Sequence, residues 1–166
     1  MKPLHYAAVA VACLALDIGA YLGLGASATA PIVPYTLLDG TTTSTGNFRG
    51  KVVLVNFWAT SCTTCVREMP QLVAVYDTYR AAGYDTLAVA MSYDPPAYVV
   101  DFAETRRLPF GIAIDNTGDI ARSFGNVQLT PTSLLINRRG EIVRRYVGVP
   151  DFAELRTLVE KLLAET

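Results

Sequence analysis

Histidine and cysteine are scarce in this chain. Its 166 residues include one histidine, His5, and three cysteines, and neither residue type occurs after residue 65. A structural zinc site draws four ligands mostly from these two residue types. The chain after residue 30 has two cysteines and no histidine, so it does not supply such a set. We predict no metal site.

Charged residues are also few. They make up 17% of the chain, the formal net charge is −1, and no basic run is interleaved with aromatic residues. A nucleic-acid surface needs clustered positive charge, so we predict no nucleic-acid partner. Hydrophobic residues reach 51%, which is too apolar for a disordered chain. The length suits one folded domain with a sizeable core.

The first thirty residues differ from the rest in composition. One lysine is followed by a long apolar stretch with a single acidic residue, Asp17, and then by small residues that end at Ala30. This layout is typical of a secretory signal with cleavage after Ala28 or Ala30. Residues 6–30 are also long enough for an uncleaved membrane anchor, which would keep the protein in contact with the membrane. Both interpretations export the globular part, and we predict a leader over residues 1–30 and a domain over residues 31–166.

The remaining chain alternates strand-like and helix-like patterns. Residues 31–50 are rich in Thr, Gly and Pro and predict a linker that leads into a short edge strand and turns. Three later segments are predicted as strands, four as helices and one as a hairpin with its turn near Arg139 and Gly140. The predicted strands are 51–59, 84–93 and 110–115, the helices 63–82, 95–108, 117–125 and 150–166, and the hairpin 131–148. This order predicts an α/β sandwich whose first strands are parallel and whose hairpin adds antiparallel partners.

Two cysteines stand where the first core strand meets a helix, in the stretch "FWATSCTTCVREMP" over residues 57–70. A disulfide between Cys62 and Cys65 closes a very short loop and removes little chain entropy, so a purely structural crosslink is poorly placed here. A redox role suits the position better. The start of a helix offers unpaired N–H groups that stabilise a thiolate at Cys62, and Cys65 lies one turn deeper as a resolving thiol.

With its neighbours, this motif resembles a known family. The stretch "VVLVNFWATSCTTCVREMP" resembles the thioredoxin superfamily, and most closely its exported TlpA/ResA-like thiol-disulfide oxidoreductases, over roughly residues 34–166. The resemblance implies a thioredoxin-like sandwich with a central mixed sheet flanked by helices. It also implies an inserted strand-helix unit before Pro131, and a Cys62–Cys65 redox disulfide.

The sequence departs from cytoplasmic thioredoxins at one chemically important place. Those proteins usually carry an aspartate six residues before the first cysteine, where this chain has Asn56. Glu68 stands three residues after Cys65 instead, as in the TlpA/ResA-like group. A buried carboxyl with a raised pKa would suit proton transfer with a thiol, so we predict Glu68 as a third catalytic residue. The alternative is an exposed helix residue paired with nearby Arg67 or with a distant arginine.

Three further residues are predicted to contact the client protein. The resemblance implies a cis bond between Thr130 and Pro131 beside the cysteine pair, with the Thr130 backbone presented to an extended client peptide. Trp58 is predicted to shield the sulfurs or to contact clients, with core packing as the alternative.

These residues predict an exported oxidoreductase that reduces disulfides of extracytoplasmic clients, in a bacterial periplasm or on the outer face of the cytoplasmic membrane. An oxidising compartment would trap the pair as a disulfide, so a membrane thiol carrier is expected to supply electrons. Apocytochrome c is a client class that the resemblance implies, and we expect no cofactor.

Two alternatives stay open. A peroxidase of the same superfamily would carry Pro and Thr where this chain has Val55 and Ala59. A non-enzymatic holding module would use the disulfide for rigidity alone.

Overall fold

The apolar run before the cysteine pair forms strand β4 (Val52–Trp58), and all seven of its residues are buried. The computed structural model describes residues 28–165. The predicted signal or anchor therefore lies outside the described residues, apart from its last three positions. Between residues 28 and 165, no helix combines the length and the apolar character that crossing a bilayer requires.

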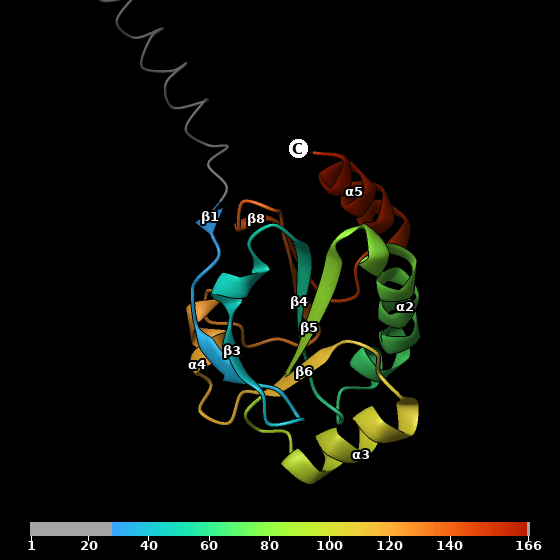
Figure 1. Ribbon diagram of the computed structural model, residues 1–166. Helices are drawn as coiled ribbons and strands as arrows, with labels where there is room; N and C mark the ends of the chain where they lie inside the picture. The colour runs from blue at the N-terminus through green and yellow to red at the C-terminus, as the bar shows by residue number, and fades with distance from the viewer. Residues whose placement is uncertain (1–27, 166) are drawn as a thin grey trace, which may run out of the picture.

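Six strands form one mixed sheet around β4 (Figure 1). β4 pairs in parallel with β5, and β5 with β6, while β7, β8 and β1 add antiparallel partners on the other side. The strand order is β1 (Ala28–Thr29), β8 (Glu141–Val147), β7 (Thr132–Ile136), β4, β5 (Tyr84–Ala90) and β6 (Gly111–Ile114). This confirms the predicted parallel first strands and antiparallel hairpin.

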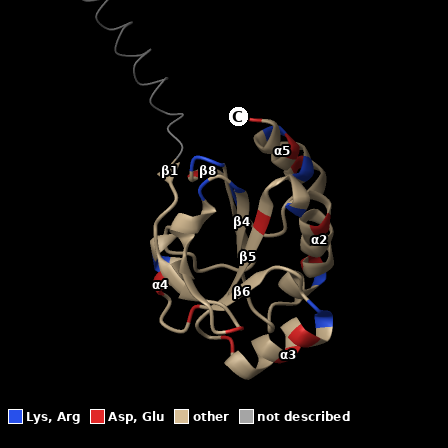
Figure 2. Ribbon diagram, in the orientation of Figure 1, with Lys and Arg blue, Asp and Glu red and all other residues tan. Residues whose placement is uncertain are grey.

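Helices cover both faces of the sheet. In Figure 1, α2 and α5 lie against one face, and α4 lies on the other. The helices are α2 (Thr63–Tyr79), α3 (Pro96–Arg106), α4 (Asp119–Ser123) and α5 (Phe152–Ala164), with short 3-10 turns η1 (Thr45–Phe48) and η2 (Arg80–Ala82). The additional strand and helix expected before Pro131 are present as β6 and its neighbouring helices. Charged residues lie mostly on the helices and loops, as the colours of the ribbon in Figure 2 show.

The alternation of side chains along β4 divides the core in two. Val52, Leu54 and Trp58 pack with α2, α3 and α5. Val53, Val55 and Phe57 pack with α4 and η1. Because successive strand residues point to opposite faces, Asn56 points toward the α2 side. This register places an amide under the helix that carries the cysteines.

Two N-terminal predictions need correction. The predicted short strand in residues 31–50 is present, but the predicted linker is not, because the segment folds into a second, two-stranded sheet of β2 (Pro34–Thr36) and β3 (Thr42–Ser44). A bridge from Leu37 to Ala113 ties this hairpin to β6. The folded part also begins before residue 31, since β1 pairs with the β8 edge and the Ala30 N–H bonds to Gly140. Exposed sheet edges favour such pairing.

Candidate redox site

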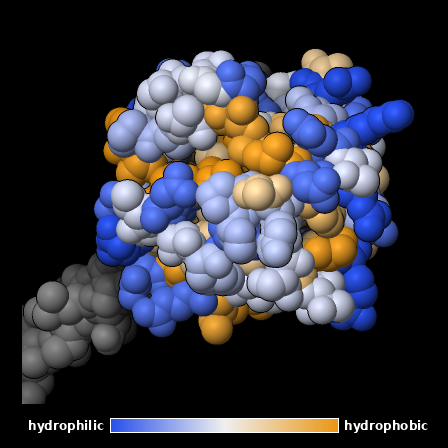
Figure 3. Space-filling view, turned by 90° about the horizontal axis from the view of Figure 1, so that it is seen from below, coloured by the Kyte–Doolittle hydropathy of each residue, from blue (hydrophilic) through white to orange (hydrophobic). Residues whose placement is uncertain are grey.

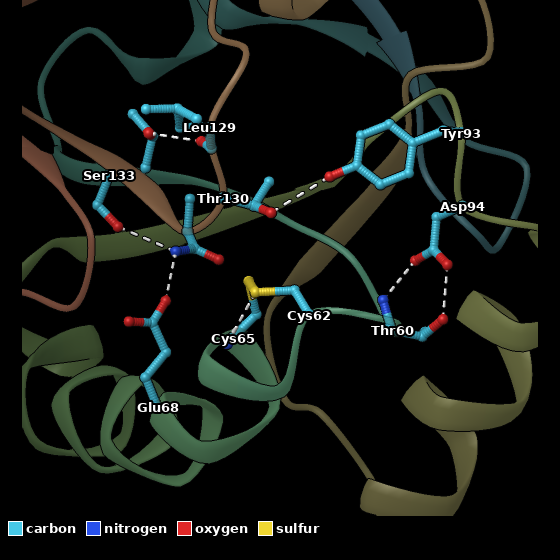
Figure 4. Close-up of a disulfide and its surroundings, with 11 residues drawn as sticks. Thr60, Cys62, Cys65, Glu68, Tyr93, Asp94, Leu129, Thr130 and Ser133 are labelled. Atoms are coloured by element: carbon cyan, nitrogen blue, oxygen red, sulfur yellow. Dashed lines mark hydrogen bonds between the residues drawn. A yellow bond between two sulfur atoms is a disulfide. The ribbon is translucent and has the colours of Figure 1, made fainter.

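The two cysteines form a disulfide at the first turn of α2 (Figure 4), with their Cα atoms 5.2 Å apart. Cys62 is the N-cap residue, and its Sγ accepts a hydrogen bond from the Cys65 backbone N–H at 3.1 Å. Cys62 is partly exposed, whereas Cys65 is 0% exposed. The pair therefore has one sulfur at the surface and one behind it.

The start of α2 favours negative charge on the exposed sulfur. The aligned peptide dipoles of a helix place partial positive charge on its first N–H groups. The first turn of this 17-residue helix contains no acidic residue that would offset that charge. The N–H donor that bonds to the Cys62 sulfur is placed where it would stabilise a thiolate once the disulfide is reduced.

Glu68 is buried beneath the pair, with 3% of its surface exposed. The alternative of an exposed residue paired with Arg67 is therefore wrong. Burial raises the pKa of Glu68 from 4.5 to about 7, although a hydrogen bond from Asn56 opposes the rise. Its Oε1 accepts that bond at 3.0 Å, and its Oε2 has no hydrogen-bond partner among the residues that the structure describes. The carboxyl thus has one buried oxygen that is not hydrogen-bonded within this part of the chain, and its raised pKa suits proton transfer near neutral pH.

Asn56 holds Glu68 in place. Its Nδ2 donates to Glu68 and also to the Ser133 Oγ, at 2.9 Å. Asn56 and Ser133 are directly opposite each other in the β4–β7 ladder, which fixes the amide from two sides. In the sequence, Asn56 was notable only because it replaces the aspartate usual in cytoplasmic thioredoxins, and its contact with Glu68 was not predicted. Nothing in the sequence indicated Ser133, because the two residues are far apart in the chain.

The Thr130–Pro131 peptide bond is cis, as the resemblance implied. The Pro131 carbonyl accepts the Gly148 N–H at 2.8 Å, so the turn is tied to the end of β8. Pro131 is buried and Thr130 is partly exposed. In Figure 4 Thr130 is seen beside the cysteine pair, with its hydroxyl turned toward Tyr93.

Trp58 does not fit the predicted contact with clients. Its side chain is 0% exposed, and its ring lies 5.2 Å from that of Phe102 between centroids. Trp58 ends a strand whose two faces are both covered, so the indole is enclosed by helix side chains. Core packing, the alternative interpretation, is the one that the structure supports. Trp58 belongs to the same buried cluster as Cys65, against which Cys62 packs, so shielding of the sulfurs stays a prediction.

Two contacts made by the loop between β5 and α3 were not predicted from the sequence. Asp94 accepts hydrogen bonds from the Thr60 backbone N–H and hydroxyl, at 2.6 and 2.5 Å. The Tyr93 hydroxyl bonds to that of Thr130 at 3.2 Å. Each bond joins residues more than thirty positions apart, so no local pattern could have predicted it.

The surface near the site carries exposed apolar side chains. Leu129 is 65% exposed next to Thr130, and Val147, which pairs with Thr132, is 61% exposed. Figure 3 views the molecule from below, where Figure 1 shows α2 beginning, and orange apolar patches stand between polar ones on this face. Apolar side chains exposed beside a reactive centre are typical of a surface that meets a partner.

Comparisons with known proteins agree with this arrangement. The family model described as Redoxin matches residues 25–159, a range that contains both cysteines, Glu68 and the cis proline. The thiol-disulfide oxidoreductase ResA of Bacillus thuringiensis is 32% identical over 133 residues, covering 80% of this chain and 76% of that protein. ResA of Geobacillus kaustophilus is 34% identical over 134 residues, covering 81% and 76%. A crystal structure of a thiol:disulfide interchange protein of the thioredoxin family from Chlorobium tepidum has a TM-score of 0.76 and 26% identity, covering 84% of this chain and 98% of that one.

Proposed function

The chain belongs to the Redoxin family and is a thiol-disulfide oxidoreductase of the ResA-like kind, and on this basis we propose that it reduces disulfides of exported proteins through Cys62 and Cys65. The asymmetry of the pair carries the proposal. The partly exposed Cys62 sulfur receives an N–H bond of 3.1 Å at the helix start, while Cys65 is 0% exposed. The exposed sulfur attacks, and the enclosed one resolves.

The exchange has two steps. The Cys62 thiolate attacks one sulfur of a client disulfide, a mixed disulfide forms, and the other client sulfur leaves as a thiolate. Cys65 then attacks the Cys62 sulfur, and the second client sulfur leaves. Two electrons pass from the cysteine pair to the client, and the pair ends as the disulfide seen in the structure. The client thiolates take up two protons, one that originates on Cys65 and one from solvent.

Glu68 handles the Cys65 proton in this scheme. Cys65 and Glu68 are three residues apart on α2, so their side chains lie on the same face of the helix. With a pKa of about 7, the carboxyl accepts a proton at neutral pH without holding it permanently. The unpartnered Oε2 is the atom assigned to receive it.

The dipeptide between the cysteines favours a reductant over an oxidant. Thr63 and Thr64 are uncharged, and the chain lacks the histidine found at this place in strong oxidants. Without such a group the reduced pair gains less stability, which favours a reductant. The donor that returns the pair to the dithiol is proposed to be a membrane thiol carrier.

The clients are proposed to be exported proteins with extended segments, apocytochrome c among them. The apolar leader supports export to the bacterial periplasm or to the outer face of the cytoplasmic membrane. The exposed Leu129 and Val147 beside the cis-proline turn support binding of an unfolded apolar segment.

The reduction potential of the cysteine pair tests the proposed direction of electron flow. A value near about −270 mV is expected for a reductant, and one near about −120 mV would identify an oxidant. A Cys65→Ser variant is expected to accumulate client mixed disulfides at Cys62, since the resolving thiol is missing. The Cys62→Ser, Cys65→Ser double variant is the control and should trap nothing. Full activity of that double variant in cells would contradict the exchange mechanism and support a holding module.

A further inference from the structure

The loop between β5 and α3, residues 91–95, approaches the redox site from two directions. Its Asp94 is only 2% exposed, yet it is an acidic residue with no basic side chain bonded to it within the described part of the chain. Both carboxylate oxygens are used by Thr60, one by the backbone N–H at 2.6 Å and one by the hydroxyl at 2.5 Å. A buried carboxylate costs free energy unless it is well bonded, so this geometry fixes Thr60 strongly.

Thr60 lies two residues before Cys62, within the segment that leads from β4 to α2. The same loop also holds the end of β4, because the Met91 N–H donates to the Trp58 carbonyl at 3.0 Å. The Cys62 N–H in turn bonds to the Ala59 carbonyl at 3.1 Å. The place of the Cys62 sulfur at the start of α2 therefore depends on how the loop holds residues 58–60.

The neighbouring residue reaches the opposite side of the site. Tyr93 is 57% exposed, and its hydroxyl bonds to the Thr130 hydroxyl at 3.2 Å. Figure 4 shows Asp94 turned toward Thr60 and Tyr93 turned toward Thr130. Two adjacent residues thus connect the segment before the attacking sulfur with the turn that precedes the cis proline.

We propose that Tyr93 and Asp94 are positioning residues for disulfide exchange: Asp94 places the Cys62 sulfur, and Tyr93 places the Thr130 backbone for a client peptide. The inference rests on the proposed exchange at Cys62. Asp94 should therefore affect the rate at which Cys62 attacks any disulfide. Tyr93 should affect the rate only for disulfides in a peptide whose backbone can pair beside Thr130.

Conservative variants separate placement from charge. In Asp94→Asn the amide oxygen still accepts the Thr60 N–H, and the amide NH₂ donates to the Thr60 hydroxyl oxygen, so both bonds remain while the charge is lost. Asp94→Ala removes both bonds. Tyr93→Phe keeps the ring and removes only the hydroxyl.

The test measures second-order rate constants for reduction of two substrates by the reduced full-length protein. One is dithiobis(nitrobenzoate), which has no peptide backbone, and the other is a peptide that contains a single disulfide. We expect Asp94→Ala to slow both reactions about tenfold, since small misplacements of a reacting group have effects of that size or larger. Asp94→Asn should stay within about threefold of wild type, and Tyr93→Phe should slow only the peptide reaction. Asp101→Ala and Tyr98→Phe, exposed positions on α3, are the matched controls and should leave both rates unchanged.

The outcomes discriminate clearly. Wild-type rates in Asp94→Ala, equal losses in Asp94→Ala and Asp94→Asn, or equal losses on both substrates in Tyr93→Phe would each overturn the inference. If Asp94→Ala does not fold, Thr60→Val removes only the hydroxyl bond and should slow both substrates, with Thr60→Ser restoring the rate. Unchanged rates in Thr60→Val would then overturn the role of Asp94. A wild-type protein that reduces neither substrate would refute the proposed function itself, whatever the variants do.

Discussion

Replacing Glu68 with glutamine should make the stability of the oxidised protein less dependent on pH. Glu68 is 3% exposed, and burial raises its pKa from 4.5 to about 7. The folded protein therefore binds a proton more tightly at this site than the unfolded chain does. Glutamine has almost the same shape, can accept the same bond from Asn56 and carries no proton to lose.

The sign of the effect follows from proton linkage. Between pH 4.5 and about 7 the folded state holds the proton that the unfolded state has released, so wild-type stability falls as the pH rises through this window. Above this pH window the folded protein carries the full free-energy cost of the buried, ionised Glu68, and below the window that cost is absent. At about 1.4 kcal/mol per pH unit the upper limit is about 3 kcal/mol, and relaxation of the surroundings around the charged carboxyl reduces it to about 2 kcal/mol.

The assay is guanidinium unfolding of the disulfide-bonded protein at several pH values from 4 to 8.5. With the cysteines oxidised, thiol titration makes no contribution. The free energy of unfolding of Glu68→Gln minus that of wild type should rise by about 2 kcal/mol across the range, most of it between pH 4.5 and 7. Glu104→Gln, an exposed position on α3, is the control and should show a flat difference. A flat or falling difference for Glu68→Gln would refute the buried, neutral carboxyl.

Three further outcomes are expected. Asn56→Asp places a second carboxyl within hydrogen-bond distance of Glu68, so it should raise the pKa of Glu68 further and lower the stability of the protein at neutral pH. NMR titration measures the first effect and denaturant unfolding the second. An unchanged Glu68 titration would contradict the contact. Trp58→Ala should cost about 3–5 kcal/mol of unfolding free energy because it empties a fully buried site, and a loss of client binding at unchanged stability would restore the contact role. Leu129→Glu should raise the KM for a peptide disulfide several-fold while leaving kcat unchanged, because it places a charge on an exposed apolar surface. An unaltered KM would show that Leu129 does not contact the client.

Local patterns were enough to predict the frame of the site. The apolar run of β4, the helix spacing after Thr63 and the cysteine spacing are all features of one short stretch, and the structure places them as that stretch indicates. The position of Glu68 one turn after Cys65 could be predicted for the same reason, because both residues belong to that stretch. Its burial could not be read from the helix itself, because it depends on Asn56 and Ser133 beneath it.

Contacts between distant segments lay beyond prediction. Asp94 had no feature that marks it as a buried acceptor, since its partner Thr60 precedes it by 34 residues. Only one short edge strand after a linker was predicted where the β2–β3 hairpin lies, because its two strands are three residues each and lack an apolar alternation. Client contact was one of the roles predicted for Trp58 because of its place beside the cysteine motif, whereas strand β4 is covered on both faces.

Alkylation of the fully reduced protein tests the central claim most directly, namely that the start of α2 ionises the exposed sulfur while its partner stays enclosed. Iodoacetamide should label Cys62 before Cys65 at pH 7, and the Cys62 rate should reach half its maximum clearly below pH ~8.5, the midpoint of an ordinary thiol. Labelling of Cys65 first, or a Cys62 sulfur that stays unreactive at neutral pH after full reduction, would contradict the account.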